Sequence, residues 1–139
     1  MNSDLILGHL EALVACDTQN PPRLIDSHSD IFRYCTDQAG SSFEIRTWDH
    51  GEGHVSWFAV RGKPKVLFNV HLDTVPDGDG WSSDPRELVI RNGRACGRGA
   101  CDIKGAAATL LALAQQESGD MALLFTSDEK QLNQDKCQG

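Results

Sequence analysis

Polar side chains that could bind a metal ion follow two apolar segments of the chain. His71 follows the run KVLFNV directly, and Asp73 comes two residues later. Asp128 and Glu129 follow the run MALLF within a few residues. Asp102 stands between a glycine-rich turn and a segment rich in Ala and Leu. One histidine together with several carboxylates suits zinc, cobalt or manganese. The chemistry that these residue types allow is metal-dependent hydrolysis.

The spacing of His71 and Asp73 places both side chains on one face of the sheet if the chain stays extended there. Asp73 would then accept a hydrogen bond from one imidazole nitrogen of His71 and leave the other nitrogen directed at a metal ion. An aspartate-capped turn with an incidental histidine explains the same residues, because so short a motif matches many unrelated sequences. The spacing leaves both interpretations open.

Asp102 has two compatible roles, as a metal ligand and as the N-cap of a helix that begins near Ile103. Gly97 and Gly99 would let the backbone approach a ligand closely. A glycine-rich turn before a helix is also typical of phosphate binding. The run GRGACDIKGA lacks the spacing of a P-loop, however, and Asp102 would repel a phosphate at the helix start. A nucleotide site is the least favoured interpretation.

Helices and strands alternate around these residues. Apolar positions at helical spacing predict a first helix from Ser3 or Asp4 to about Asp17, a weaker helix over 26–38, and a helix over 103–116.

Apolar runs predict four strands. They cover residues 43–48, 55–60, 65–70 and 121–125. The run 65–70 is expected to be a central strand that is buried on both faces, because it is almost continuously apolar. Asn92-Gly93 predicts a hairpin turn. Helices and strands in this order predict one α/β domain with helices packed on a sheet.

Composition limits the class of protein. The chain has 139 residues, of which 40% are hydrophobic, and this fits a single globular domain. Its net charge of −7 and the lack of a basic run argue against nucleic acid as a partner. Five cysteines without a CxxC pair favour free thiols in a reducing compartment. We expect no membrane span and a cytoplasmic location, because no apolar run is long enough and the start lacks a basic segment.

Three motifs in order resemble one known family. NVHLDTVP, GRGACDIKGA and LLFTSDE are similar to the zinc aminoacylase and metallopeptidase family of acetylornithine deacetylases, acetylcitrulline deacetylases and succinyl-diaminopimelate desuccinylases. The early TQNPPR resembles the first loop of that family, and the likeness extends over about residues 5–129. The resemblance implies a three-layer α/β sheet with helices on both faces, as the N-terminal part of a binuclear-zinc exopeptidase-like catalytic domain.

The resemblance also implies roles for individual residues. By it, His71 ligates one zinc ion, Asp102 bridges two ions, and Asp73 orients His71. Glu129 matches the general base that activates the attacking water. The implied reaction removes the acyl group of a small N-acyl amino acid, acetylornithine or acetylcitrulline, in arginine biosynthesis, with zinc or cobalt as cofactor.

The sequence departs from the family after Glu129. Lys130 stands where the family has a second glutamate that ligates a metal ion, and residues 130–139 do not resemble the family. We therefore expect residues 1–129 to be the N-terminal part of a catalytic domain, truncated before the later ligands and the lid domain with its homodimer interface.

Two consequences are expected of such a chain. It should be poorly active, and its sheet should present an unpaired edge or an apolar face that favours aggregation. The alternative is a non-catalytic remnant that binds at most one metal ion or a partner.

Overall fold

A computed structural model of the chain describes residues 2–22 and 24–128, and it has the α/β fold that the sequence predicts. The helices are α1 (Ser3–Ala15), α2 (Asp30–Ala39) and α3 (Gly105–Gln116), and a short irregular turn, η1 (Ala100–Lys104), leads into α3. The strands are β1 (Glu44–Asp49), β2 (Val55–Arg61), β3 (Leu67–His71), β4 (Val89–Arg91), β5 (Arg94–Cys96) and β6 (Met121–Thr126).

Four of the strands form one mixed sheet in the order β1-β2-β6-β3. β2 is antiparallel to both β1 and β6, whereas β3 is parallel to β6. In the β3–β6 register His71 lies opposite Thr126. The carboxyl ends of β3 and β6 therefore meet at one edge of the sheet, which is where open α/β sheets bind their ligands.

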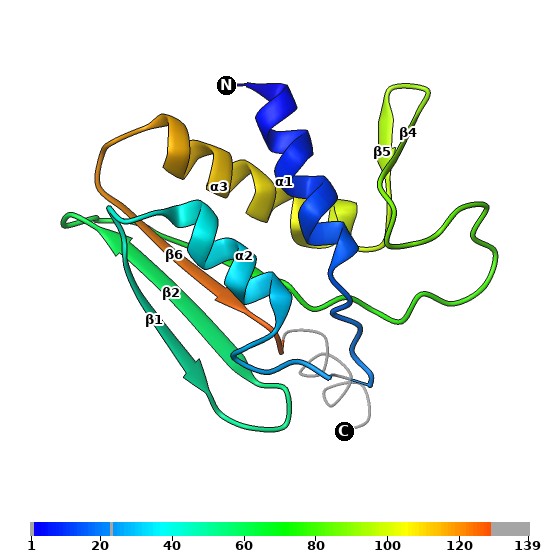
Figure 1. Cartoon of the computed structure of the whole chain (residues 1–139), viewed down its shortest axis with the longest axis horizontal. Coiled ribbons are helices and arrows are strands. Elements are labelled where there is room, and N and C mark those ends of the chain that lie inside the picture. Colours follow the sequence, from blue (N-terminus) through cyan, green and yellow to red (C-terminus); the bar gives the residue numbers. More distant parts are fainter. Residues whose placement is uncertain (1, 23, 129–139) are drawn as a thin grey trace.

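All three helices pack on the same face of this sheet (Figure 1). The described residues therefore form two layers, whereas the family resemblance implies three, with helices on both faces. Strand side chains alternate between the two faces, and those of Val55, Trp57 and Phe125 are buried in one core with the helices. The stacked rings of Trp57 and Phe125, 5.1 Å apart between centroids, form the middle of this core. The opposite face carries Phe58 and Leu124, which are only half-buried.

Strand β3 differs from its prediction as a central strand buried on both faces. In the described part of the chain it pairs with β6 alone, so it is an edge strand. Val66, Leu67 and Phe68 are 61%, 49% and 41% exposed. The prediction was wrong because an apolar run shows that side chains need cover, but it does not show which other segment supplies that cover.

The helix boundaries follow local capping chemistry. Asn2, rather than Ser3 or Asp4, caps α1, and its side chain accepts hydrogen bonds from the backbone nitrogens of Asp4 and Leu5. Gly40 ends α2 with a positive φ of 80°, as the sequence predicts.

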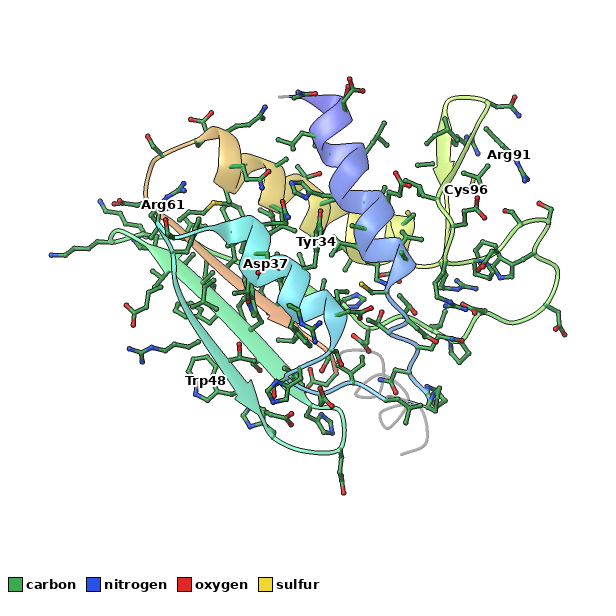
Figure 2. The ribbon with its side chains drawn as sticks, viewed as in Figure 1. Tyr34, Asp37, Trp48, Arg61, Arg91 and Cys96 are labelled. Atoms are coloured by element: carbon green, nitrogen blue, oxygen red, sulfur yellow. The ribbon has the colours of Figure 1, made fainter. Side chains whose placement is uncertain are left out.

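Arg61, labelled in Figure 2 at the end of β2, ties the C-terminal end of α3 to the sheet. Its guanidinium donates to the carbonyl oxygens of Ala114, Glu117 and Gly119.

The hairpin β4–β5 forms where the sequence predicts it, around Asn92 and Gly93, whose φ angles of 52° and 74° suit a tight hairpin turn. It projects from the body of the molecule beside η1 (Figure 1) and carries the exposed Cys96, labelled in Figure 2. No helix among the described residues is long and apolar enough to cross a membrane.

Candidate metal centre

His71, the last residue of β3, contacts two of the three aspartates that the sequence singles out. Its Nδ1 lies 3.0 Å from the backbone oxygen of Asp73 and 3.3 Å from Asp73 Oδ1. Its Nε2 lies 3.1 Å from Asp102 Oδ1. Residues 31 positions apart in the sequence, His71 and Asp102, are thus brought together. The predicted contact between His71 and Asp73 is present, although the nearer acceptor is the backbone carbonyl.

The carboxylate of Asp73 is completely buried. A buried carboxylate is stable only where donors compensate its lost hydration. The side-chain nitrogen of Asn20 supplies one such donor, 3.2 Å from Asp73 Oδ2. Asp73 is therefore a fixed acceptor for the His71 ring, whereas the Asp102 side chain is 65% exposed and accessible to an ion from solvent.

Asp102 does not cap α3, contrary to the N-cap role that the sequence suggests. It lies inside η1 with φ −126° and ψ 83°, and no side-chain hydrogen bond caps either η1 or α3. Gly99 precedes this turn with φ 81°, and a Cβ there would lie 2.5 Å from Thr74 Cγ2. The glycine lets the turn approach the segment after β3 closely. That approach brings Asp102 to His71.

The arrangement of these atoms fits a metal cation. If Nδ1 of His71 carries the ring proton and donates to Asp73, the lone pair of Nε2 faces a carboxylate oxygen of Asp102. Two electron-rich atoms in this position require a proton or a cation between them. A histidine held by a carboxylate and paired with a second carboxylate is also a common zinc ligand set. Within residues 2–22 and 24–128, no group of three or more His, Cys, Asp or Glu side chains converges.

The carboxyl end of β6 is held by a second set of contacts. Ser127 is buried, its Oγ donates to the carbonyl oxygen of Gly53, and it accepts from the backbone nitrogen of Val55. Asp128 Oδ2 lies 3.3 Å from Nδ1 of His54. The sequence placed Asp128 at this sheet edge, as found, but gave no reason to pair it with His54. The predicted base Glu129 lies outside the described residues.

Several residues that hold the site were not predicted to do so. Thr18 and Asn20 contact Leu72 and Asp73 in the segment after β3, and Lys104, in the turn that carries Asp102, contacts Cys16. Asn20 belongs to the segment TQNPPR, for which the sequence indicated a likeness to the first loop of the family and no role in the site. Lys104 is 1% exposed, and a buried lysine cannot be recognised from sequence spacing.

A small hollow of about 140 Å³ borders the site. Its walls come from the segment after β3, the glycine-rich turn and η1, with the lining residues Thr74, Val75, Gly97, Arg98, Gly99, Cys101 and Asp102. The hollow therefore opens beside one of the two candidate ligands and offers both apolar and polar walls.

Comparisons with known proteins agree with this arrangement. Residues 67–132 match the model of Peptidase family M20/M25/M40. The chain is 53% identical over 131 residues, 94% of its length, to the N-acetyl-L-citrulline deacetylase of Xanthomonas campestris pv. campestris. It is 34% identical over 125 residues, 85% of its length, to the succinyl-diaminopimelate desuccinylase of Zymomonas mobilis subsp. mobilis. These matches cover 35% and 33% of the two relatives, so the chain spans about a third of their length.

Solved structures show the same fold. Human carnosine dipeptidase 1 matches 91% of this chain and 32% of its own with a TM-score of 0.66 at 23% identity. The M20 family metallo-carboxypeptidase Sso-CP2 of Sulfolobus solfataricus matches 94% of this chain and 32% of its own with a TM-score of 0.64 at 20% identity. The family match begins at the first residue of β3 and includes His71, Asp73 and Asp102. The chain belongs to peptidase family M20/M25/M40.

Proposed function

We propose that this chain carries part of the active site of a metal-dependent amide hydrolase that removes the acyl group from an N-acyl amino acid. The observation that carries the proposal is the contact of His71 Nε2 with Asp102 Oδ1, with the opposite ring nitrogen held by buried Asp73. Similarity to a deacetylase and a desuccinylase of N-acyl amino acids supports the substrate class. The free thiols of the described cysteines support a cytoplasmic location.

His71 and Asp102 would hold the metal, for which we propose zinc, with cobalt as a substitute. When bound, such an ion polarises the amide carbonyl and makes water more acidic. Asp73 keeps the proton of the His71 ring on Nδ1, so that Nε2 stays available as a ligand. The hollow beside Asp102 is large enough for a small acyl group. We further propose Glu129 as the base that takes the proton from the attacking water.

A chimera with the Xanthomonas relative tests this function. Within the aligned part, the residues of the relative are replaced with those of this chain as far as Glu129, so that the relative supplies the residue at the position of Lys130. Hydrolysis of N-acetyl-L-citrulline is then measured with added zinc. We expect an active chimera whose kcat/KM falls at least about 100-fold on His71→Ala, because a metal contributes several kcal/mol to such a reaction. The exposed His28 provides the control, since His28→Ala should leave kcat/KM within about twofold.

Two results of this experiment would contradict the proposal. One is a chimera that melts at the temperature of the relative but hydrolyses nothing. The other is a His71→Ala chimera that keeps its activity.

A non-catalytic remnant that binds at most one metal ion is the second candidate. The observation that favours it is that only His71 and Asp102 meet as candidate ligands in the described part of the chain. Two ligands are fewer than the three or four that hold zinc tightly in proteins. Rapid zinc-dependent hydrolysis of N-acetyl-L-citrulline by the 139-residue chain itself would rule this candidate out, whereas we expect that chain to be poorly active.

A further inference from the structure

The segment directly after α1, residues 16–20, runs beside the segment that follows β3. Thr18 Oγ1 donates to the carbonyl oxygen of Leu72 at 2.7 Å. The backbone nitrogen of Thr74 donates to Thr18 at 2.9 Å, and that of Asn20 donates to Thr74 at 2.8 Å. Three hydrogen bonds thus fix the chain on either side of Asp73. No residue of this segment is a metal ligand in the site as proposed above.

The side chain of Asn20 extends this connection to the metal pair. It is 3% exposed, and its nitrogen lies 3.2 Å from Oδ2 of the buried Asp73. The other oxygen of Asp73 lies 3.3 Å from the His71 ring. If Asn20 lost its amide, the Asp73 carboxylate would lose a donor in a place that water cannot reach, and it would turn or shift to regain one. The orientation of the His71 ring therefore depends on Asn20.

The opposite end of the segment holds the turn that carries Asp102. Lys104 is 1% exposed, and its Nζ donates to the carbonyl oxygen of Cys16 at 3.0 Å. Cys16 is the C-cap of α1, where carbonyl oxygens lack helical partners and the helix end is partly negative. The backbone nitrogen of Lys104 also donates to Gly99 at 2.8 Å. Lys104 therefore anchors η1 to the end of α1.

We propose that Asn20 and Lys104 are positioning residues for the metal pair, Asn20 through Asp73 and His71 and Lys104 through the turn that carries Asp102. Residues 16–20 then set the distance between the two ligands, because one segment is bonded to both of the elements that carry them. The inference rests on the proposed metal pair. Neither residue contacts the ion in this account.

A titration of the 139-residue chain with cobalt(II), followed by its absorption spectrum, tests the proposal. We expect Asn20→Ala and Lys104→Met each to weaken cobalt binding about tenfold or more, as is usual when a residue that orients a ligand is removed. Lys63, which is exposed, supplies the matched control, and Lys63→Met should bind within about twofold of the unaltered chain. Circular dichroism confirms that each variant is folded at the temperature of the titration.

Folded Asn20→Ala and Lys104→Met variants that bind cobalt like the Lys63→Met control would overturn the proposal. An unfolded Lys104→Met chain would show that Lys104 is needed for the fold itself, which removes it as a positioning residue. The Asn20→Ala variant then tests the remaining part of the proposal, which is the role of Asn20.

The Nδ1–H resonance of His71 in the metal-free chain gives a readout that does not require the ion. We expect a resonance protected from solvent exchange in the unaltered chain and in Lys63→Met, and its loss to exchange in Asn20→Ala. A resonance unchanged by Asn20→Ala would contradict the role of Asn20. If the unaltered chain binds no cobalt, the proposed function fails, while this resonance still decides whether Asn20 positions His71.

Discussion

At the scale of single residues, one ring nitrogen of His71 lies beside a buried carboxylate and the other lies beside an exposed one. Asp73 is buried and holds Nδ1 of His71, whereas Asp102 is largely exposed and faces Nε2. The sequence predicts the first contact, because a spacing of two residues in an extended chain places both side chains on one face. It could not predict the contact of His71 with Asp102, which depends on how η1 folds back onto the sheet.

Buried thiols make stability fall in alkaline solution. Burial raises the pKa of Cys35 well above its usual range, and burial together with Asp30 raises the pKa of Cys16 to about 11. Unfolded thiols release their protons near pH 9, so above this pH the unfolded state binds fewer protons than the native state. Stability is therefore fully present below pH 9 and is lost as pH rises further. Lys104, whose pKa burial lowers to about 8, acts with the opposite sign.

A comparison of variants isolates the contribution of Cys35. We expect the free energy of unfolding of the unaltered chain to fall by about 2 kcal/mol more than that of Cys35→Ala between pH 8 and pH 10.5. Urea unfolding followed by circular dichroism measures the difference. Cys96, which is exposed, supplies the control, and Cys96→Ala should follow the unaltered chain. Parallel pH profiles of Cys35→Ala and the unaltered chain would contradict the assignment.

At the scale of elements, the sequence predicted the features that local signals determine and missed those that long-range contacts determine. The hairpin at Asn92-Gly93 and the end of α2 at Gly40 were predicted correctly, because turn and cap residues act through their own backbone angles. The edge position of β3 and the irregular turn η1 were not predicted. Both depend on residues far away in the sequence, namely β6 for the strand and residues 16–20 for the turn.

Arg61 should be the main connection between the end of α3 and the sheet. Its guanidinium donates to three carbonyl oxygens at 2.8 to 2.9 Å and lies 4.5 Å from the ring of Phe43. We expect Arg61→Met to lower the free energy of unfolding by about 2–3 kcal/mol, because bonds from a charged donor are stronger and the carbonyls lose their partner. Urea denaturation provides the measurement.

A second arginine serves as the matched control for this prediction. Arg46 on β1 pairs with Glu44 at 2.9 Å, but both side chains are about two-thirds exposed. Exposed ion pairs contribute little, so Arg46→Met should change the free energy of unfolding by less than about 1 kcal/mol. Equal losses in the two variants would show that Arg61 has no special role.

At the scale of the whole molecule, helices cover one face of the sheet and leave the β3 edge uncovered. Two hollows of about 380 and 270 Å³ flank this edge, and both are lined by Pro64, Lys65 and Val66. The unpaired edge expected from the sequence is therefore present in the described part of the chain. Exposed apolar edge strands pair readily with other strands.

The β3 edge should make the chain associate with itself. We expect sedimentation velocity to show larger species as the concentration rises, and Leu67→Lys to reduce them, because a charge on the edge opposes strand pairing. Leu24 is 87% exposed and lies outside the sheet, so Leu24→Lys is the control. A chain that stays monomeric at all concentrations would contradict the prediction. Equal effects of Leu67→Lys and Leu24→Lys on self-association would also contradict it.

Metal binding by the 139-residue chain tests the central claim most directly. Isothermal titration with zinc should show about one weakly bound ion per chain, because two residues are the candidate ligands that meet in the described structure. His71→Ala and Asp102→Asn should each abolish this binding, while His28→Ala should leave it unchanged. Zinc binding that persists in both His71→Ala and Asp102→Asn would contradict the account.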